Sequence, residues 1–505
     1  MLTPDYESFR ALSRRGNLIP LYREILADID TPVGVLKSLA GKSRLFLLES
    51  VEGGEKWGRY SFMGFDPRAV IKVRGPAVTI EEGDVRTVIP HLGDPLEILR
   101  NYLQKYIPVS IGGLPRFFGG AVGFFHYEMA RYFDRGISLP PSGENVEEAI
   151  FFITDTLLIF DRIRHTLKIV ACTFLDDKDN LRQEYDRCAS RIEEITAMLT
   201  SSSRREAPSP GMPACSLASS VTPDQFTDMV KKAKEHIFAG DIIQVVISQR
   251  FQGECQLSPA DLYRALRYVN PSPYLFFFRD NDLALIGSSP EAMVRLEEGQ
   301  LELRPIAGTR PRGRDEKEDQ KRADELLNDE KERAEHVMLV DLGRNDLGRV
   351  SRIGTVQVNQ LMRVERYSHV MHLVSSIRAQ LDDGKDAFDV LKATFPAGTL
   401  SGAPKIRAMQ IISELERMPR GPYGGAIGYF SFNGNMDFGI TIRTIVLEGN
   451  ILSIQAGAGI VADSEPEHEL AETINKARGM MKALDLAASG FDLMEFQGGY
   501  YDTHD

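Results

Sequence analysis

The sequence of 505 residues is poor in the features that mark secreted and membrane proteins. It has four cysteines, Cys172, Cys188, Cys215 and Cys255, and their spacing fits neither a zinc site nor a disulfide framework. No apolar run approaches the roughly 20 residues of a membrane span, and the N-terminal segment lacks the apolar core of a signal peptide. We therefore expect a protein of the reducing cytoplasm that has no membrane partner.

Positive charge is also scarce. The 60 Lys and Arg residues are outnumbered by 72 Asp and Glu residues, so the net charge is −12. A surplus of acid disfavours nucleic acid or an anionic membrane as the main partner, although a local basic pocket remains compatible with it. We expect no nucleic-acid partner.

The length of the chain exceeds one ordinary domain and indicates two. Residues 198–220 are rich in Ser, Pro and Ala and lack periodicity, which predicts a linker or surface loop at 201–220. We assign an N-terminal part to 1–200, a C-terminal part to 221–490 and a tail to 491–505. Short strands alternate with helices without βαβ repeats, which predicts an α+β fold with large antiparallel sheets surrounded by helices.

Two glycine-rich segments resemble each other, GGAVGFF at 119–125 and GGAIGYF at 424–430. They indicate either two related lobes or two tight strand crossings where only glycine fits. The segment 424–462 alternates strand-like runs with Asn-Gly and Gly-Asn turns, which predicts an antiparallel meander.

Two acidic pairs, Glu332 with Glu335 and Glu469 with Glu472, stand at helical spacing. On spacing alone each pair is typical of a solvated helix face. An apolar run follows the first pair and a glycine-rich strand precedes the second, which favours two helices whose carboxylates converge. Such a group would suit Mg²⁺, which takes one or two protein carboxylates and keeps water or substrate oxygens elsewhere.

Several segments have the character of anion-binding sites. Gly308 and Thr309 follow a predicted strand, and Gly457 and Gly459 alternate along another, where glycine exposes backbone donors. Arg443 lies within an apolar run and is predicted to be a buried strand residue that requires an anionic partner. Together with the acidic pairs, these segments indicate a small polycarboxylate ligand.

The ordered motifs of the C-terminal part resemble those of the chorismate-utilising enzymes over about residues 222–482. In chain order they are RPIAGTR, DEKERAEHVMLVDLGRND, YSHVMHLVSS, FPAGTLSGAPKIRAM, YGGAIGYF, IRTIV and QAGAGIVADSEPEHELAETINKA. Gln244 stands where members that add water usually carry lysine, and it is similar to the ammonia-using branch. Ala307 in PIAGT is similar to anthranilate synthase component I, whereas aminodeoxychorismate synthases tend to carry lysine there.

The resemblance implies a two-lobed anthranilate-synthase-like fold and a lyase that converts chorismate and ammonia to anthranilate and pyruvate. That reaction is the first committed step of tryptophan biosynthesis. The resemblance also implies Mg²⁺ as the cofactor, held by Glu335 and Glu472 with Glu469 nearby. The residues implied to contact chorismate are Gly308, Thr309, Tyr423, Arg443, Gly457, Ala458, Gly459 and Lys476.

The catalytic residues implied by the resemblance are His372, Thr399, Glu332 and Gln244. Ammonia would attack C2 of the ring while the C4 hydroxyl leaves with help from Glu332 as the acid. His372 would then take the C2 proton as pyruvate is eliminated.

Two further segments, LFLLES and NPSPYLFFF, resemble the halves of a tryptophan feedback site in an N-terminal regulatory lobe. Glu49 and Ser50 would hold the tryptophan amino group, and Pro273, Tyr274 and Leu275 would line its ring. Without the resemblance, LFLLES is more typical of a buried edge strand.

None of the cysteines lies in a strand-to-helix turn typical of a glutaminase nucleophile. The resemblance therefore implies that ammonia comes from a separate glutamine amidotransferase subunit, in a heterotetramer with two of each. The nearest rival function is the synthesis of aminodeoxychorismate. A rival of a different class is a catalytically inactive protein that binds tryptophan.

Overall fold

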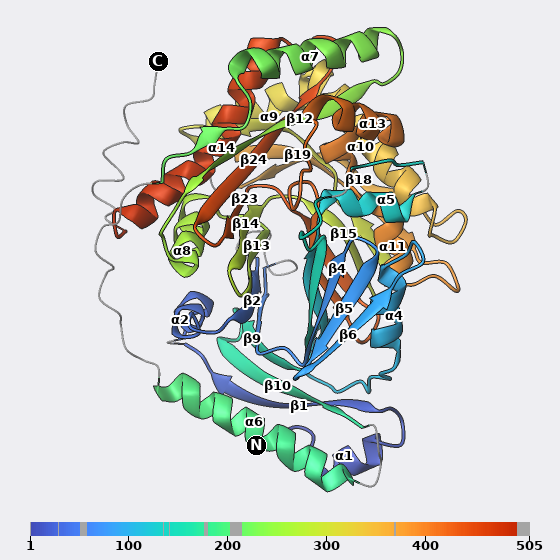
Figure 1. Ribbon diagram of the computed structural model, residues 1–505, viewed down its shortest axis with the longest axis vertical. Coiled ribbons are helices and arrows are strands. Elements are labelled where there is room, and N and C mark those ends of the chain that lie inside the picture. The colour runs from blue at the N-terminus through green and yellow to red at the C-terminus, as the bar shows by residue number, and fades with distance from the viewer. Residues whose placement is uncertain are drawn as a thin grey trace.

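The computed structural model describes residues 2–28, 30–50, 58–134, 136–140, 142–175, 180–201, 215–367 and 370–491. Two 12-stranded sheets face each other, and helices cover their outer faces and one end (Figure 1). Every named strand pair is antiparallel, as the sequence predicts. The fold is therefore α+β with two large antiparallel sheets.

The first sheet, sheet A, contains strands from both parts of the chain. In spatial order they are β1 (Leu18–Leu26), β10 (Thr166–Phe174), β9 (Thr156–Asp161), β3 (Tyr60–Phe65), β2 (Arg44–Glu49), β13 (Tyr274–Asp280), β14 (Leu283–Ser289), β23 (Thr444–Glu448), β24 (Ile451–Ile460), β12 (Gln244–Glu254) and β11 (Ala218–Ser219), and β20 (Gly402–Ala403) also pairs with β12.

The second sheet, sheet B, is built in the same way. Its order is β17 (Ile306–Pro311), β19 (Val370–Gln380), β16 (Gln300–Leu303), β15 (Ala292–Glu297), β22 (Met436–Ile440), β21 (Ala426–Ser431), β7 (Gly120–Phe125), β8 (Ala149–Thr154), β4 (Ala69–Arg74), β5 (Ala77–Glu82) and β6 (Val85–Pro90), and β18 (Gln357–Arg366) also pairs with β19.

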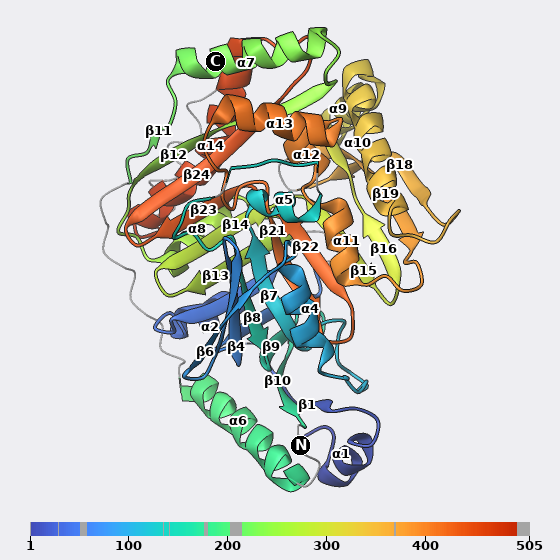
Figure 2. The same cartoon turned by 45° about the vertical axis from the view of Figure 1, so that its right-hand side comes forward.

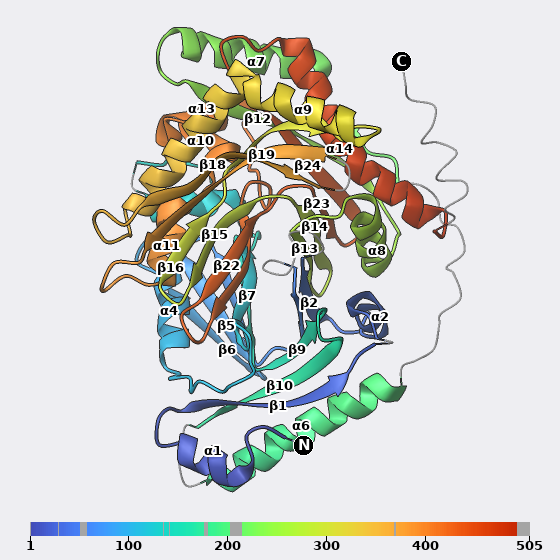
Figure 3. The same ribbon diagram turned by 180° about the vertical axis from the view of Figure 1, so that it is seen from behind.

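The helices lie outside the two sheets, and Figures 2 and 3 show them from two further sides. They are α1 (Tyr6–Leu12), α2 (Pro32–Ser38), α4 (Leu96–Gln104), α5 (Ala130–Phe133), α6 (Leu181–Ser201), α7 (Pro223–Phe238), α8 (Pro259–Val269), α9 (Glu316–Asn328), α10 (Glu330–Gly348), α11 (Ala387–Thr394), α12 (Gly398–Ser401), α13 (Lys405–Glu416) and α14 (Pro466–Ala488), with the 3-10 turn η1 (Tyr127–Met129) before α5. Among the described helices, none is long and apolar enough to cross a membrane.

The continuous apolar run of β2 follows from burial on both faces of sheet A. Phe46 joins the core between the sheets, where Phe278 of sheet A stacks on Phe152 of sheet B. Leu45 and Leu47 point the other way, into the core beneath the helices. A strand that is covered on both faces has no polar side, so it reads as one hydrophobic run.

The two parts of the chain repeat one topology. Outward from the β2–β13 pair, sheet A continues as β3, β9, β10, β1 on one side and β14, β23, β24, β12 on the other. Outward from the β7–β21 pair, sheet B continues as β8, β4, β5, β6 and as β22, β15, β16, β19. In each sheet, the strands of the N-terminal part and those of the C-terminal part follow one another in the same relative chain order. This repeat supports the interpretation of the two similar glycine-rich segments as parts of two related lobes.

The two similar segments, 119–125 and 424–430, also contain positions where only glycine fits. Gly123 of β7 and Gly428 of β21 pair directly where the two halves meet in sheet B. A Cβ at Gly123 would lie 2.0 Å from the carbonyl oxygen of Ile150, and one at Gly428 would lie 2.1 Å from that of Asp437. Each glycine lets its own strand approach the backbone of a neighbour.

Three sequence predictions about organisation need correction or narrowing. The segment 424–462 is not one meander, because β22 belongs to sheet B and β23 to sheet A. The predicted linker 201–220 is too long at its C-terminal end, because Ala218–Ser219 form β11, which pairs with β12. Residues 202–214 of that linker and 492–505 of the predicted tail lie outside the described residues. Strands of 1–200 and 221–490 share both sheets, and the boundary between those parts stays a prediction.

The cysteine prediction was wrong for one pair, because the structure joins Cys215 to Cys255 in a disulfide. A single bridge has no repeating spacing from which the sequence could reveal it. Cys172 and Cys188 are free and buried.

We expect Gly123→Ala to lower the stability of the fold by about 1–3 kcal/mol, because the added methyl group must push β8 away. The matched control is Gly479→Ala in α14, where no atom lies within 4 Å of the new Cβ and alanine favours the helix. Thermal unfolding followed by circular dichroism measures both. Equal midpoints for the two variants would contradict this account of the glycine pair.

Candidate functional site

Most of the predicted site residues come together at one end of the two-sheet sandwich, in the upper half of Figure 1. There α10 packs on β17 and β19 of sheet B, and α14 packs on β24 of sheet A. The predicted residues on these elements, together with those on β12 and the loops beside them, form the candidate active site.

The two acidic pairs face each other from α10 and α14. Burial raises the pKa of Glu335 most, and the charges of Glu332 and, from the other helix, Glu472 raise it further. A hydrogen bond from Gln244 acts in the opposite direction. The pKa of Glu469 is raised by burial and also by Glu472. Carboxylates far apart in the sequence therefore share one electrostatic environment, as the sequence predicts.

This carboxylate group has the donor chemistry of a hard divalent cation. Within the described ranges, no set of three or more His, Cys, Asp or Glu residues is gathered as a complete metal cage. Glu335 and Glu472 do offer two opposed carboxylates, and Mg²⁺ binds through one or two such groups and fills its other positions with water or substrate oxygens. The residues present therefore fit Mg²⁺ better than a metal that needs several protein ligands.

Lys476 connects α14 to the glycine-rich strand β24. Its ammonium group pairs with Glu472 at 2.6 Å and donates to the carbonyl oxygen of Gly457 at 2.9 Å. A Cβ at Gly457 would lie 2.6 Å from the hydroxyl of Tyr423, and one at Gly459 would lie 2.5 Å from the amide nitrogen of Gln244. Lys476, Tyr423 and Gln244, all predicted site residues, therefore lie against the backbone of Gly457–Gly459 in β24.

The predicted base, His372, is held by strand pairing. Thr309 of β17 pairs with His372 of β19, and a register shift occurs at Gly308, which has φ +66°. The Nδ1 atom of His372 lies 3.0 Å from the carbonyl oxygen of Gly308 and 3.1 Å from Oγ1 of Thr309. Because a carbonyl oxygen only accepts, this contact assigns the proton to Nδ1 and leaves Nε2 as the basic nitrogen.

Arg443 is placed differently from the prediction. It lies in the bend between β22 and β23 at φ +50°, not within a strand, because the chain passes from sheet B to sheet A there. Burial lowers the pKa of its guanidinium group, and Tyr423 acts against this shift. No carboxylate of the described residues pairs with it, so an anion is needed as its partner.

The structure identifies an acid that the sequence reasoning missed. Glu291 lies between β14 and β15, and the hydroxyl of Thr399 donates to its carboxyl oxygen at 2.8 Å. Burial raises the pKa of Glu291 to about 7, and the hydrogen bond from Thr399 and the charge of Lys476 act against this shift. Glu332, the predicted acid, instead pairs with Arg310 at 3.0 Å. The only sequence signal of Glu291 was a lone glutamate between two apolar strands.

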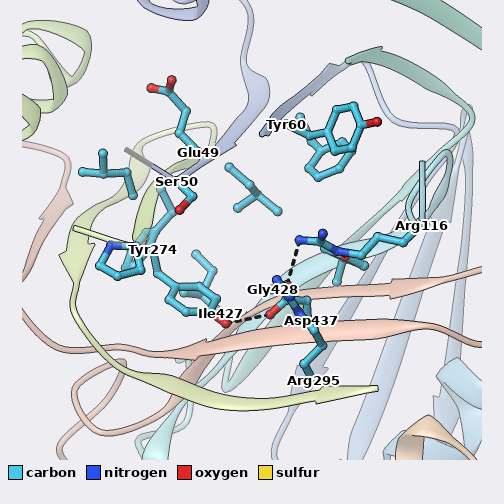
Figure 4. Close-up of a pocket in the computed structure, with 15 residues that line it drawn as sticks. Glu49, Ser50, Tyr60, Arg116, Tyr274, Arg295, Ile427, Gly428 and Asp437 are labelled. Atoms are coloured by element: carbon cyan, nitrogen blue, oxygen red, sulfur yellow. Dashed lines mark hydrogen bonds and ion pairs between the residues drawn. The ribbon is translucent and has the colours of Figure 1, made fainter. Parts of the chain in front are cut away.

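The predicted tryptophan residues meet at a separate pocket between the sheets (Figure 4). Glu49, Ser50, Pro273, Tyr274 and Leu275 all line it, and its volume is about 60 Å³. The halves of this site are joined by pairing of β2 with β13, in which Leu275 faces Glu49.

The side chain of Glu49 is directed away from the other labelled groups of this pocket (Figure 4). Its carboxylate accepts a hydrogen bond of 2.6 Å from Tyr263 and ion-pairs with Arg162 and Arg267. Asp437 is the carboxylate at the opposite wall, where it is held by Arg295, Arg116 and the hydroxyl of Tyr274. The carboxylates of Glu49 and Asp437 therefore both already form ion pairs with arginine side chains.

Comparison with known proteins agrees with this geometry. Residues 46–482 match the family described as chorismate binding enzyme. The chain is 47% identical to anthranilate synthase component 1 of Aquifex aeolicus (strain VF5), over 96% of this chain and 98% of that protein. It is 46% identical to anthranilate synthase component 1 of Pseudomonas putida, over 95% of this chain and 98% of that protein.

Two solved structures share the fold. The crystal structure of anthranilate synthase component I from Streptococcus pneumoniae TIGR4 superposes with a TM-score of 0.75 at 36% identity, covering 90% of this chain and 99% of that one. The menaquinone-specific isochorismate synthase from Escherichia coli has a TM-score of 0.68 at 21% identity, covering 96% and 99%, and its likeness concerns the fold alone.

The chain therefore belongs to the family of chorismate binding enzymes. Within that family it resembles anthranilate synthase component I over nearly its full length, and its two-lobed fold is confirmed.

The raised pKa of Glu291 has a consequence for stability. The folded state holds a proton on this group up to about pH 7, whereas an unfolded glutamate releases it near its ordinary pKa of 4.5. Stability from this group is therefore present at acidic pH and is lost as pH rises through about 7. Relative to Glu291→Gln, the wild type should lose up to about 3 kcal/mol between pH 5 and pH 8.

Denaturant unfolding of both proteins across this range measures the difference. Glu467→Gln, at an exposed position on α14, is the control and should parallel the wild type. Parallel curves for wild type and Glu291→Gln would refute the raised pKa.

Proposed function

We propose that this chain is the large subunit of an anthranilate synthase, which converts chorismate and ammonia to anthranilate and pyruvate. The observation that carries the proposal is the convergence of Gln244, Glu335 and Glu472, with His372 on β19, the strand against which α10 packs. Gln244 follows the ammonia-using pattern of the family. The relatives named above as component 1 support the same activity.

Chorismate has two carboxylates, and the site offers a place for each. Mg²⁺ on Glu335 and Glu472 would supply a positive charge that neutralises these groups and holds one substrate carboxylate. Arg443, which lacks an acidic partner in the described chain, and Tyr423 beside it suit the second carboxylate. Fixing both ends of a rigid diacid sets the position of its ring.

In the first step, ammonia forms a bond to C2, the ring double bonds shift, and the C4–O bond breaks. The hydroxyl leaves as water when it takes a proton from an acid, and the new nitrogen group loses one. We assign the acid to Glu291 in place of Glu332, because burial keeps Glu291 protonated near neutral pH and Glu332 is engaged with Arg310.

In the second step, Nε2 of His372 takes the proton from C2 and the ring becomes aromatic. The C3–O bond breaks with its electron pair staying on oxygen, so the enolate of pyruvate leaves and takes up one proton at its methylene carbon to become pyruvate. The contact of Nδ1 with Gly308 suits this role, because it keeps the lone pair on Nε2.

A partner that releases ammonia is part of the proposal. Burial raises the pKa of both free thiols, Cys172 and Cys188, which makes them poor nucleophiles, and Cys215 is joined to Cys255. We therefore propose a separate glutamine amidotransferase subunit and a heterotetramer with two of each. We place the complex in the cytoplasm, where disulfides are rare and the Cys215–Cys255 bridge would be an exception.

Feedback inhibition by tryptophan is the regulatory part of the proposal. The pocket of about 60 Å³ is smaller than the roughly 300 Å³ or more of usual ligand sites, so tryptophan would have to displace its lining side chains. Tyr274 is one of them, and its ring packs on Gly439 of β22, whose partner in β15 is Ala292. Ala292 follows Glu291 directly, so movement of Tyr274 has a short route to the acid.

We expect Glu335→Gln and Glu472→Gln each to lower Mg²⁺-dependent formation of fluorescent anthranilate from chorismate and ammonium salt by about 100-fold or more. Binding of Mn²⁺, followed by electron paramagnetic resonance, should weaken in parallel. Glu330→Gln, at an exposed position in the first turn of α10, is the matched control and should act as wild type.

Near-normal turnover in either carboxylate variant would refute the metal assignment. Release of a non-aromatic amino product by the wild type would favour aminodeoxychorismate synthesis instead, and tryptophan binding without turnover would favour an inactive regulatory protein.

We expect Ser50→Ala to raise the tryptophan concentration that half-inhibits the enzyme by about tenfold, within the usual range of allosteric coupling. Ser43→Ala, which lies just before β2 and is exposed, is the control. Tryptophan titration of anthranilate formation measures both variants, and unchanged inhibition in Ser50→Ala would disprove the pocket assignment.

A further inference from the structure

A second cavity lies behind Tyr423, on the face of sheet A that is turned toward residues 419–423, and its volume is about 230 Å³. Arg250 of β12 and Gln455 of β24 are paired across its floor, and Thr444 of β23 also lines it. Tyr423 lines this cavity while its hydroxyl approaches Gly457, so it separates the cavity from the backbone predicted to hold chorismate.

Among the described residues, the guanidinium group of Arg250 has no acidic partner. It donates to Gln455 at 3.2 Å and to the carbonyl oxygens of Pro419 at 2.6 Å and Arg420 at 3.1 Å. No carboxylate in the described part of the chain forms an ion pair with it. Burial lowers the pKa of Arg250, which shows that the protein compensates its charge poorly. An anion in the cavity would supply the missing partner.

The neighbouring carboxylates do not cancel this charge. Glu416 is matched by Arg420 at 2.6 Å. Glu128 accepts the backbone N–H groups of Arg420 and Gly421, and burial raises its pKa to about 7, so it is only partly ionised at neutral pH. Glu448 also lines the cavity but lies at an exposed position. Arg250 therefore dominates the electrostatics of the cavity floor.

His126 supplies a polar group on another wall. Its side chain is 6% exposed, and its Nδ1 atom has no hydrogen-bond partner within the described chain. Burial, and then the charge of Arg250, lowers its pKa to about 3, so the ring is neutral. A buried polar atom without a partner is costly unless a ligand or water satisfies it. The hydroxyl-bearing Ser142 lines the same wall region.

We propose that this cavity binds a small monocarboxylate and, on the proposed function, receives the pyruvate released beside Tyr423 and Arg443. Pyruvate offers a carboxylate to Arg250 and a carbonyl oxygen to the ring N–H of His126 on another wall of the cavity. A separate place for pyruvate would clear the second carboxylate position of the chorismate site before the next turnover.

Saturation-transfer NMR of pyruvate with the full chain tests the site directly. We expect binding to the wild type, at least about tenfold weaker binding to Arg250→Gln, and none of the uncharged methyl pyruvate. Because Arg250 also donates to backbone carbonyls, Ser453→Leu serves as a second variant that fills the cavity from β24 and retains the charge. Thr87→Leu, on the exposed strand β6, is its matched control and should bind as wild type.

Pyruvate in the chorismate site is distinguished by Arg443→Gln. Binding that survives Arg443→Gln and is lost in Ser453→Leu supports the proposal, and the reverse pattern overturns it. Absence of pyruvate binding to the wild type also overturns it. None of these outcomes depends on turnover, so failure of the chain to make anthranilate would be a separate result.

Discussion

Mutual repulsion among carboxylates is the constraint around which the candidate site is arranged. Glu335 and Glu472 come from helices that begin more than a hundred residues apart, and the charge of Glu472 raises the cost of ionising both Glu335 and Glu469. Gln244 and Lys476 offset part of that cost from β12 and from α14 itself. The remainder favours a positive charge at the site, which a divalent cation would supply under the proposed function.

The same site separates two kinds of acid by their surroundings. Glu332 meets Arg310 and is held as a partner of a cation, whereas Glu291 has one hydroxyl donor and an apolar environment. The two glutamates thus have different surroundings, and burial raises the pKa of Glu291. The pocket between the sheets contacts the strand next to Glu291, because Tyr274 lies against Gly439, the partner of Ala292 in β15.

The sequence predicted the α+β class, most strand positions and most of the residues that lie at the candidate site. Motif order sufficed there, because Gly308, His372 and Lys476 act through short-range pairing and helix spacing. It could not place Arg443, since the exchange of the chain between sheets at residues 441–443 is decided by tertiary packing. Glu291 escaped notice because its raised pKa comes from side chains far away in sequence, and the Cys215–Cys255 bridge left no periodic signal.

The shared sheets make the two halves of the chain a pair that is joined mainly by strand contacts. β2 meets β13 and β7 meets β21 through backbone hydrogen bonds, and among the described residues β10 ends at Phe174 and the next named strand, β11, begins at Ala218. A chain divided in that interval would keep every named strand intact on one fragment or the other. Neither fragment would possess the whole pocket between the sheets, because Glu49 and Tyr274 would then belong to different polypeptides that must reassociate to rebuild it.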